Sequence, residues 1–233
     1  MIKKYIAATV ISLFGGGAFF TGTAQAQDDD PAWSVEGYVG LYTDYRDRGL
    51  ALSDFDPTVA GSLGVFHKSG FYGGIDAAII DDGRGGDTKT EFYLGYSIDK
   101  GDYIYDFSVE LDGIHGDTSN YYSEFKASVA RDFGIAFIRG GMAYAPEGRW
   151  NTPDVDSFYT YADLELPVPT IPELTFISHF GYDARSSRSN LWDWSVGVSA
   201  FIETFEVSLT FEDSSLDQNI GNGRFILSTK FYF

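Results

Sequence analysis

The sequence contains no cysteine, few basic residues and no long apolar run after residue 26. Without cysteine, a disulfide framework and a thiolate metal site are excluded. The 16 Lys and Arg residues stand against 34 Asp and Glu, which gives a net charge of -18. Such a chain has no basic surface to displace counterions from phosphates, which argues against nucleic acid as a partner. A spanning helix needs about 20 apolar residues, so none is predicted after residue 26.

The first 26 residues follow the pattern of a secretory signal peptide. Lys3 and Lys4 precede the apolar stretch "YIAATVISLFGGGAFF", and a small-x-small triplet, Ala24 to Ala26, follows it. This order predicts export and cleavage before Gln27. An uncleaved membrane anchor is the alternative, but the apolar run is short and rich in glycine.

Apolar and polar residues alternate with period two through the rest of the chain. Near the C-terminus, Phe225, Leu227 and Phe231 alternate with Arg224 and Lys230. The stretches "TFEVSLTFED", "LWDWSVGVSA" and "DYIYDFSVELD" show the same division. Alternation this regular predicts strands that each have one apolar face.

Short and long breaks separate these strands in turn. The short breaks include "HKSG", "DKGD" and "RDFG", and the long ones include "DRGLALSDFD", "DDGRGGDT" and "PEGRWNTPDVD". Short turns at one end and long loops at the other are typical of a transmembrane up-and-down barrel with periplasmic turns and extracellular loops. Six such hairpins predict an all-β antiparallel barrel of about 12 strands, an even number as in single-chain bacterial barrels.

A soluble β-sandwich or lipocalin-like barrel is the alternative fold, because alternation does not say which face points inward. The membrane barrel is favoured by polar faces that are acidic and poor in Lys, and by aromatic residues at the ends of the apolar faces. We predict that Phe231 and Phe233, the aromatic end of the last strand, form the signal for the outer-membrane assembly machinery.

The expected chain has three parts: a cleaved signal peptide at 1–26, a periplasmic linker at 27–32 and the barrel at 33–233. The predicted location is the outer membrane of a Gram-negative bacterium, in contact with lipid and lipopolysaccharide. No cofactor is predicted, and the oligomeric state is left open.

The beginning of the predicted barrel resembles a known family. The stretch "GYVGLYTDYRDRGLALSDFDPTVAGSLGVFHKSGFYGG" is similar to the start of the TorF-type porins, a bacterial outer-membrane family formerly of unknown function. Weaker similarity continues at 91–97, 120–134 and 191–200. The resemblance implies a barrel with a pore and does not supply a solute. The residues that carry the family signature are Thr43, Asp44, Tyr45, Arg46, Arg48, Gly49, Ser53, Asp54 and Pro57.

If the apolar faces meet lipid, the polar faces line a lumen. The predicted inward bases are Arg46, Lys126, Arg139, Arg224 and Lys230. A larger set of acids predicts a negative interior, and charged rings in a pore select ions by their field, so cations should be preferred. These acids are Glu36, Asp44, Asp76, Asp106, Glu110, Asp112, Glu124, Asp163, Glu165, Asp193, Glu206 and Glu212.

The same charges could instead pair with one another and with inward tyrosines and fill the barrel. A barrel of 12 strands lies between eight strands, which side chains can fill, and 16, which leave an aqueous channel. On the first strand, Asp44 and Arg46 are expected to face the lumen, while Leu41 and Tyr45 face lipid. The pair of Asp44 and Arg46 either sets a constriction or is a structural ion pair that fixes the strand register.

Catalysis and metal binding are weakly indicated. A hydrolase needs a nucleophile, a histidine and an orienting group. Of the three histidines, His67 is placed in a short turn, His115 in a long loop and His179 on an inward face. No enzyme is predicted. The acidic loop with Asp81, Asp82 and Asp87 lacks the spacing of an EF-hand, and a calcium site there is only a weak hypothesis.

The sequence therefore predicts a porin-like channel for passive diffusion of small solutes. The alternatives are a non-conducting barrel whose acidic loops bind a partner, a ligand or divalent ions bridging lipopolysaccharide, and an outer-membrane hydrolase.

Overall fold

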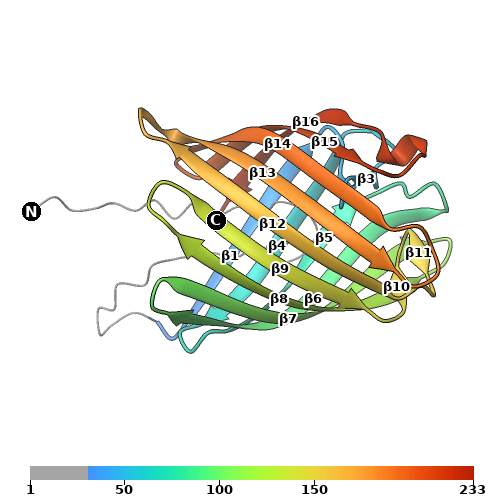
Figure 1. Ribbon diagram of the computed structural model, residues 1–233, viewed down its shortest axis with the longest axis horizontal. Helices are drawn as coiled ribbons and strands as arrows, with labels where there is room; N and C mark the ends of the chain where they lie inside the picture. The colour runs from blue at the N-terminus through green and yellow to red at the C-terminus, as the bar shows by residue number, and fades with distance from the viewer. Residues whose placement is uncertain (1–30) are drawn as a thin grey trace, which may run out of the picture.

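The computed structural model describes residues 31–233, so the predicted signal peptide and most of the predicted linker lie outside the described residues. Twelve strands form one closed antiparallel barrel (Figure 1). The predicted fold class is thereby confirmed. The barrel strands are β1 (Trp33–Tyr42), β4 (Thr58–His67), β5 (Phe71–Ile79), β6 (Gly86–Lys100), β7 (Tyr103–Gly116), β8 (Asn120–Asp132), β9 (Phe137–Ala145), β12 (Ser157–Val168), β13 (Ile171–Arg185), β14 (Leu191–Ile202), β15 (Phe205–Ser214) and β16 (Arg224–Tyr232).

Each barrel strand pairs with the next one along the chain, and β16 closes the sheet on β1. At the closure, the backbone N–H groups of Gly37 and Phe233 each donate to the other residue's carbonyl oxygen, both at 3.0 Å. Closure leaves no unpaired sheet edge, which is the condition for strands to cross a bilayer. Within residues 31–233, no helix is long and apolar enough to cross a membrane.

Alternate side chains divide cleanly between the two sides of the wall. Leu94 is 67% exposed and Phe225 is 71% exposed, whereas Glu110 and Asp193 are 3% and 2% exposed. A soluble barrel would show the reverse, with the charged residues outside. The apolar faces therefore form an outer belt, and the acidic faces line the interior.

Short connections at one end of the barrel face mostly longer ones at the other end, as predicted, except that 117–119 is as short as 68–70. The long connections at 80–85 and 117–119 are shorter than expected because β6, β7 and β8 extend into them. His115 consequently lies at the end of β7 and not in a loop, which corrects the prediction.

Two long connections carry short hairpins that the alternation did not predict. Between β1 and β4, β2 (Arg46–Asp47) pairs with β3 (Leu50–Ala51), and between β9 and β12, β10 (Gly148–Arg149) pairs with β11 (Thr152–Pro153). A short 3-10 helix, η1 (Asn219–Gly221), lies between β15 and β16.

The placement of Asp44 and Arg46 on the first strand was wrong, because β1 ends at Tyr42. Both residues belong to the following segment, and both are buried. Tyr45, predicted to face lipid, is half-buried and packs in a small apolar cluster at the loop end of the barrel. Its buried members are Leu50, Leu52, Ala60, Ala78, Ile80, Ile114, Trp150 and Leu191, from both hairpin segments and from the wall.

This cluster fixes the hairpins to the inside of the wall. Leu50 and Leu52 are almost completely buried, and burial of one such side chain contributes about 1.5–3 kcal/mol. The hairpins are thus held by an apolar core of their own.

The outer belt gives a direct test of the orientation. Leu94 lies midway along β6, and Leu94→Arg should lower the free energy of unfolding in lipid vesicles by about 2–4 kcal/mol, because a charge at the bilayer midplane is poorly solvated. Ile135→Arg, in the exposed turn at 133–136, should cost about 0–1 kcal/mol. Urea titration of the refolded protein measures both. Equal losses would contradict a lipid-facing belt.

Candidate functional site: a charged lumen crossed by a strap

The two short hairpins enter the barrel from opposite sides. Six barrel strands, β4 to β9, separate them in one direction, and six, β12 to β16 and β1, in the other. We call the two segments 46–51 and 148–153 together the strap. They meet inside the wall, where the carboxylate of Asp47 accepts hydrogen bonds from the Arg149 guanidinium and from Trp150 Nε1, the latter at 2.9 Å. The strap therefore crosses the loop end of the lumen.

Arginines of both hairpins converge on one acid of the wall. Arg48 Nη2 lies 2.7 and 2.8 Å from the carboxylate oxygens of Glu124 on β8, and Arg149 Nη1 lies 2.9 and 3.0 Å from them. The Arg48 guanidinium also stacks over the ring of Tyr159 at 3.8 Å. Buried charges require partners of this kind, because an unpaired buried charge is strongly destabilising.

The charge of Asp47 is maintained by the same groups. Burial by itself would raise the pKa of the Asp47 carboxyl, but Arg149, Lys89 and Arg48 outweigh burial and hold that pKa below its usual range. Asp47 is therefore ionised at neutral pH, and the strap is joined by attraction between opposite charges.

The residues of the family signature build the first hairpin. Asp44 accepts from Arg46 Nε at 2.8 Å and from Ser53 Oγ at 3.3 Å, and the other nitrogens of Arg46 donate to the carbonyls of Gly49 and Asn222 at 3.1 and 2.9 Å. Gly49 has a φ of +73°, and a Cβ there would lie 3.0 Å from Ser214 Cβ.

The pair of Asp44 and Arg46 thus holds together the loop after β1 and does not lie in a barrel strand whose register it could fix. Its part in a constriction stays a prediction. The signature Thr43 accepts a hydrogen bond from the backbone N–H of Leu227 at 3.0 Å, which ties the beginning of the loop to β16.

Below the strap, the wall of β6 to β8 carries alternating acids and lysines. Lys89 Nζ lies 3.2 Å from Glu91 Oε2 and 3.3 Å from Asp112 Oδ1. Lys126 pairs with Glu110 and lies 3.4 Å from Glu124. Each lysine therefore serves two carboxylates.

The opposite wall holds a histidine between two acids. His179 Nδ1 lies 2.6 Å from Asp163 Oδ1, and His179 Nε2 lies 3.0 Å from Asp193 Oδ2 and 2.7 Å from Tyr159 Oη. Arg139 donates to Asp163 at 2.7 Å. These contacts make His179 part of the charged lining of the lumen.

The predicted lumen residues lie on the inner side of the wall or in its loops, and their role in selectivity stays a prediction. Arg224 is an exception to the predicted placement: it is exposed at the mouth and stacks over Phe55 at 3.8 Å. Residues that the prediction omitted also line the interior, namely Asp47, Lys89, Glu91, Arg149, Asp183 and Arg185. Lys89 and Glu91 could have been found, because they alternate with Thr90 and Phe92. Arg149 lies in a loop without periodicity.

In the acidic loop that was a weak candidate for a calcium site, the carboxylates accept hydrogen bonds from the loop's own backbone. Asp82 accepts from the N–H groups of Arg84 and Gly86, both at 2.8 Å, and Asp81 accepts from that of Gly83 at 3.0 Å. Within residues 31–233, no three His, Cys, Asp or Glu side chains are placed to hold a metal ion.

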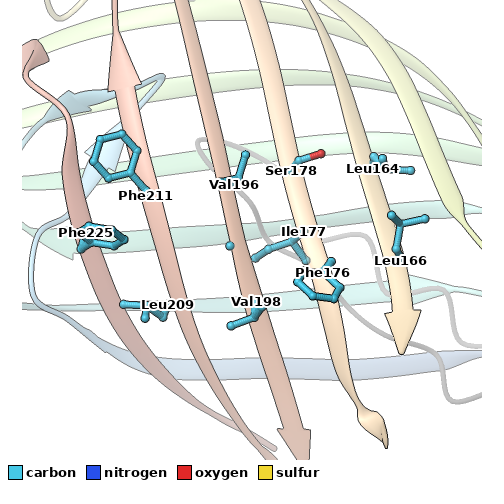
Figure 2. A pocket seen from close by; sticks show the side chains of 11 residues that line it. Leu164, Leu166, Phe176, Ile177, Ser178, Val196, Val198, Leu209, Phe211 and Phe225 are labelled. Carbon is cyan, nitrogen blue, oxygen red and sulfur yellow. The ribbon is translucent and has the colours of Figure 1, made fainter. Parts of the chain in front are cut away.

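A shallow apolar hollow of about 440 Å³ lies on the wall formed by β12 to β16 (Figure 2). Side chains of the outer belt line it, among them Leu166, Phe176, Val198 and Leu209. The hollow belongs to the apolar surface, and the charged groups of the interior do not line it.

Comparison with known proteins places this architecture in a family. The sequence profile of Gcw_chp, described as a bacterial protein of unknown function, matches residues 26–231. The chain belongs to the Gcw_chp family. A comparison of this Gcw_chp protein with curated proteins found no significant match.

Solved structures share the fold of this Gcw_chp protein. The KdgM porin has 9% identity and a TM-score of 0.58, over 86% of this chain and 99% of that porin. The KdgM porin in complex with disordered oligogalacturonate has 8% identity, the same TM-score and the same coverage. A structure described as "Unveiling the Mechanism Behind the in-meso Crystallization of Membrane Proteins" has 13% identity and a TM-score of 0.57, over 85% and 83% of the two chains. At these identities the likeness shows the fold alone.

Removal of one strap arginine should loosen both hairpins. Arg149→Ala takes partners from Asp47 and Glu124, and breaking a buried ion pair costs about 3–5 kcal/mol. Amide hydrogen exchange in the strap should accelerate at least about 100-fold, since about 1.4 kcal/mol is a factor of ten. Mass spectrometry measures the exchange, with Arg188→Ala in the exposed loop at 186–190 as the control. Unchanged exchange would mean that the ion pairs do not hold the strap.

The stabilisation by Asp47 should depend on pH. An Asp with a pKa below its usual value of about 3.9 stabilises the folded state fully above that value, and the contribution is lost as the pH falls toward the folded-state pKa. Asp47→Asn should therefore accelerate strap exchange at pH 7, and its difference from the natural protein should narrow by pH 3, after correction for intrinsic rates. A difference that is independent of pH would contradict the assignment.

Proposed function

We propose that this chain is a porin-like channel of a Gram-negative outer membrane, which passes small solutes by passive diffusion and prefers cations. The observation that carries the proposal is the closed barrel with an apolar exterior and a densely charged, mainly acidic interior. An interior packed only for stability would hold few ionisable side chains, because burial of charge is costly unless it serves a structure or a function.

The charge balance of the lining supports the cation preference. The strap and β6 add Arg48, Arg149 and Lys89 to the predicted bases, but Asp47 and Glu91 join the acids in the same region. Acids such as Glu212, which accepts from the Thr210 hydroxyl at 3.1 Å, also lie in the interior. A lining with an excess of carboxylates attracts cations and repels anions.

The similar fold of KdgM suggests how solute charge could differ between such barrels. One KdgM structure contains oligogalacturonate, an anionic ligand. The acidic interior of this Gcw_chp protein is suited to solutes of the opposite charge.

The membrane location is supported by several features together. The apolar belt would contact lipid and lipopolysaccharide, the first 26 residues resemble an export signal, and the signature from Thr43 to Pro57 resembles the TorF-type porins. Phe231 and Phe233 lie at the end of the closing strand with exposed rings, where the assembly machinery could engage them.

A catalytic role is not proposed. His179 lies between Asp163 and Asp193, and its contacts with Tyr159 and with these two acids fit a structural and electrostatic role in the lumen.

The strap favours a second candidate, a non-conducting barrel whose loops bind a ligand. Its hairpins are joined across the loop end by the contacts of Asp47 with Arg149 and Trp150. A strap that stays closed would block diffusion, whereas one that leaves a gap or opens would form a constriction. Electrical measurement separates the two.

Currents through the protein, purified from outer membranes and inserted in a planar bilayer, should be steady and cation-selective in a salt gradient. Glu206→Gln, which removes a buried lumen carboxylate on β15, should lower the cation-to-anion permeability ratio by up to about fivefold, because a unit charge at about 4 Å contributes about 1 kcal/mol in water. Glu203→Gln, in the exposed turn between β14 and β15, is the matched control and should leave the ratio unchanged. A correctly folded barrel without current would refute the channel.

A further inference from the structure

Four polar residues lie directly opposite one another across β4 to β7. Ser62 pairs with Asp76, Asp76 with Glu91, and Glu91 with Asp112. All four belong to the inward faces of their strands. We call Asp76, Glu91 and Asp112 the carboxylate row. Like charges placed directly opposite on neighbouring strands are destabilising, so the row requires positive charge.

Lys89 supplies part of that charge, at one end of the row. Its ammonium group bridges Glu91 Oε2 and Asp112 Oδ1, at 3.2 and 3.3 Å. Asp76, at the other end, forms no ion pair with any residue in 31–233. Lys89 therefore pairs with two of the three carboxylates. Lys126 pairs with Glu110 and Glu124, and its positive charge acts on Asp76 and Glu91 from farther away.

Buried oxygen atoms without hydrogen bonds mark the interval between Asp76 and Glu91. Glu91 is 3% exposed, and its Oε1 has no hydrogen-bond partner, nor has Asp76 Oδ1. The Tyr93 hydroxyl is also buried; Ser62 Oγ lies close to it and to the Asp76 carboxylate, but none of these three groups forms a well-aligned hydrogen bond at Ser62 Oγ, Tyr93 Oη or Asp76 Oδ1. An unsatisfied buried polar atom costs about 1–3 kcal/mol, and more if it is charged. These oxygens are therefore able to accept hydrogen bonds from a bound donor.

The strand pairing that places Asp76 opposite Glu91 resembles the pairing of Glu91 with Asp112, which Lys89 neutralises. Neighbouring strands are about 4.8 Å apart, so the backbone positions of Asp76 and Glu91 are related by the same step as those of Glu91 and Asp112. Tyr93 lies on the same wall, with its hydroxyl over Gly74, where a Cβ would be 2.3 Å from Tyr93 Oη. An ammonium group between Asp76 and Glu91 could form ion pairs with both carboxylates, as Lys89 does with Glu91 and Asp112.

Elsewhere in the lumen the protein places its own cations against a carboxylate and a tyrosine ring. Lys230 lies 3.4 Å from Glu206 and 5.6 Å from the ring centre of Tyr38. The Arg139 guanidinium pairs with Asp163 at 2.7 Å and lies 5.7 Å from the ring centre of Tyr161. Acid and tyrosine together form a recurrent environment for nitrogen cations in this barrel.

We propose that the interval between Asp76 and Glu91 binds the primary ammonium group of a small organic amine. The three N–H donors of such a group match the free carboxylate oxygens. A metal ion is a poorer match, because the described residues do not bring three acidic or histidine ligands to one point. That small amines are also solutes of this barrel depends on the proposed channel function.

The binding test uses the full protein in detergent, with methylammonium chloride as the probe and calorimetry as the readout. We expect saturable binding, and at least a tenfold loss of affinity in Glu91→Gln and in Asp76→Asn. Glu165→Gln, which removes a lumen carboxylate on β12 away from the row, should change the affinity less than twofold. Tetramethylammonium, which has no N–H donor, and potassium at the same ionic strength should not compete.

Absence of saturable binding to the natural protein would overturn the proposal, as would equal competition by potassium or tetramethylammonium, or an equal effect of all three variants. The row variants remove unfavourable like charge and should fold. Unfolding midpoints provide a second measurement: methylammonium should raise the midpoint of the natural protein, since a ligand that binds only the folded state stabilises it. It should not raise the midpoint of Glu91→Gln, and an equal rise in both would count against the site.

The same preparation separates this site from the channel. Methylammonium binding without current in the bilayer would keep the site and reject the channel. Cation-selective current without methylammonium binding would keep the channel and reject the site.

Discussion

The structure depends on closure of an alternating sheet, because closure separates charge from lipid around the whole circumference. Every barrel strand sends one set of side chains outward and the other inward, and the pairing of β16 with β1 completes the separation. With no open edge, the backbone is satisfied within the sheet. The lumen can then hold acids such as Asp193 and Glu110, which a lipid-facing position would exclude.

Closure also brings many acidic side chains together inside the barrel, and other lumen residues compensate their charge. Acids from adjacent strands face one another across short distances, so each needs a cation, a tyrosine hydroxyl or an amide nearby. Lys89 and Lys126 are shared between carboxylates on one wall, and Arg139 and His179 serve Asp163 on the other. At the loop end the strap brings in arginines that the strands do not supply. The charged groups of the lining therefore also stabilise the barrel, and the proposed solute passage would depend on the same groups.

The strand content could be predicted from the sequence because alternation is a local property. The inward placement of Asp106 and the outward placement of Leu209 follow from period two alone. Where β1 ends at Tyr42 the periodicity ends too, and the extrapolation that placed Tyr45 in lipid failed.

The strap could not be predicted for the same reason. Asp47 and Arg149 are 102 positions apart, and their meeting requires both the positions of two loops on opposite sides of the barrel and an apolar cluster from many strands. The resemblance to the TorF-type porins identified Arg46, Arg48 and Gly49 as a motif, but only the structure shows that they build a loop. Arg224 follows the inward phase of β16 yet is exposed, because it begins the strand at the mouth.

In the proposed channel, an acidic lumen passes small solutes according to their charge. Swelling of liposomes that contain the purified protein, in solutions of cationic, neutral and anionic solutes of matched size, tests this most directly. We expect the fastest swelling with the cation and the slowest with the anion. Equal rates for the three solutes, or rates no higher than in protein-free liposomes, would contradict it.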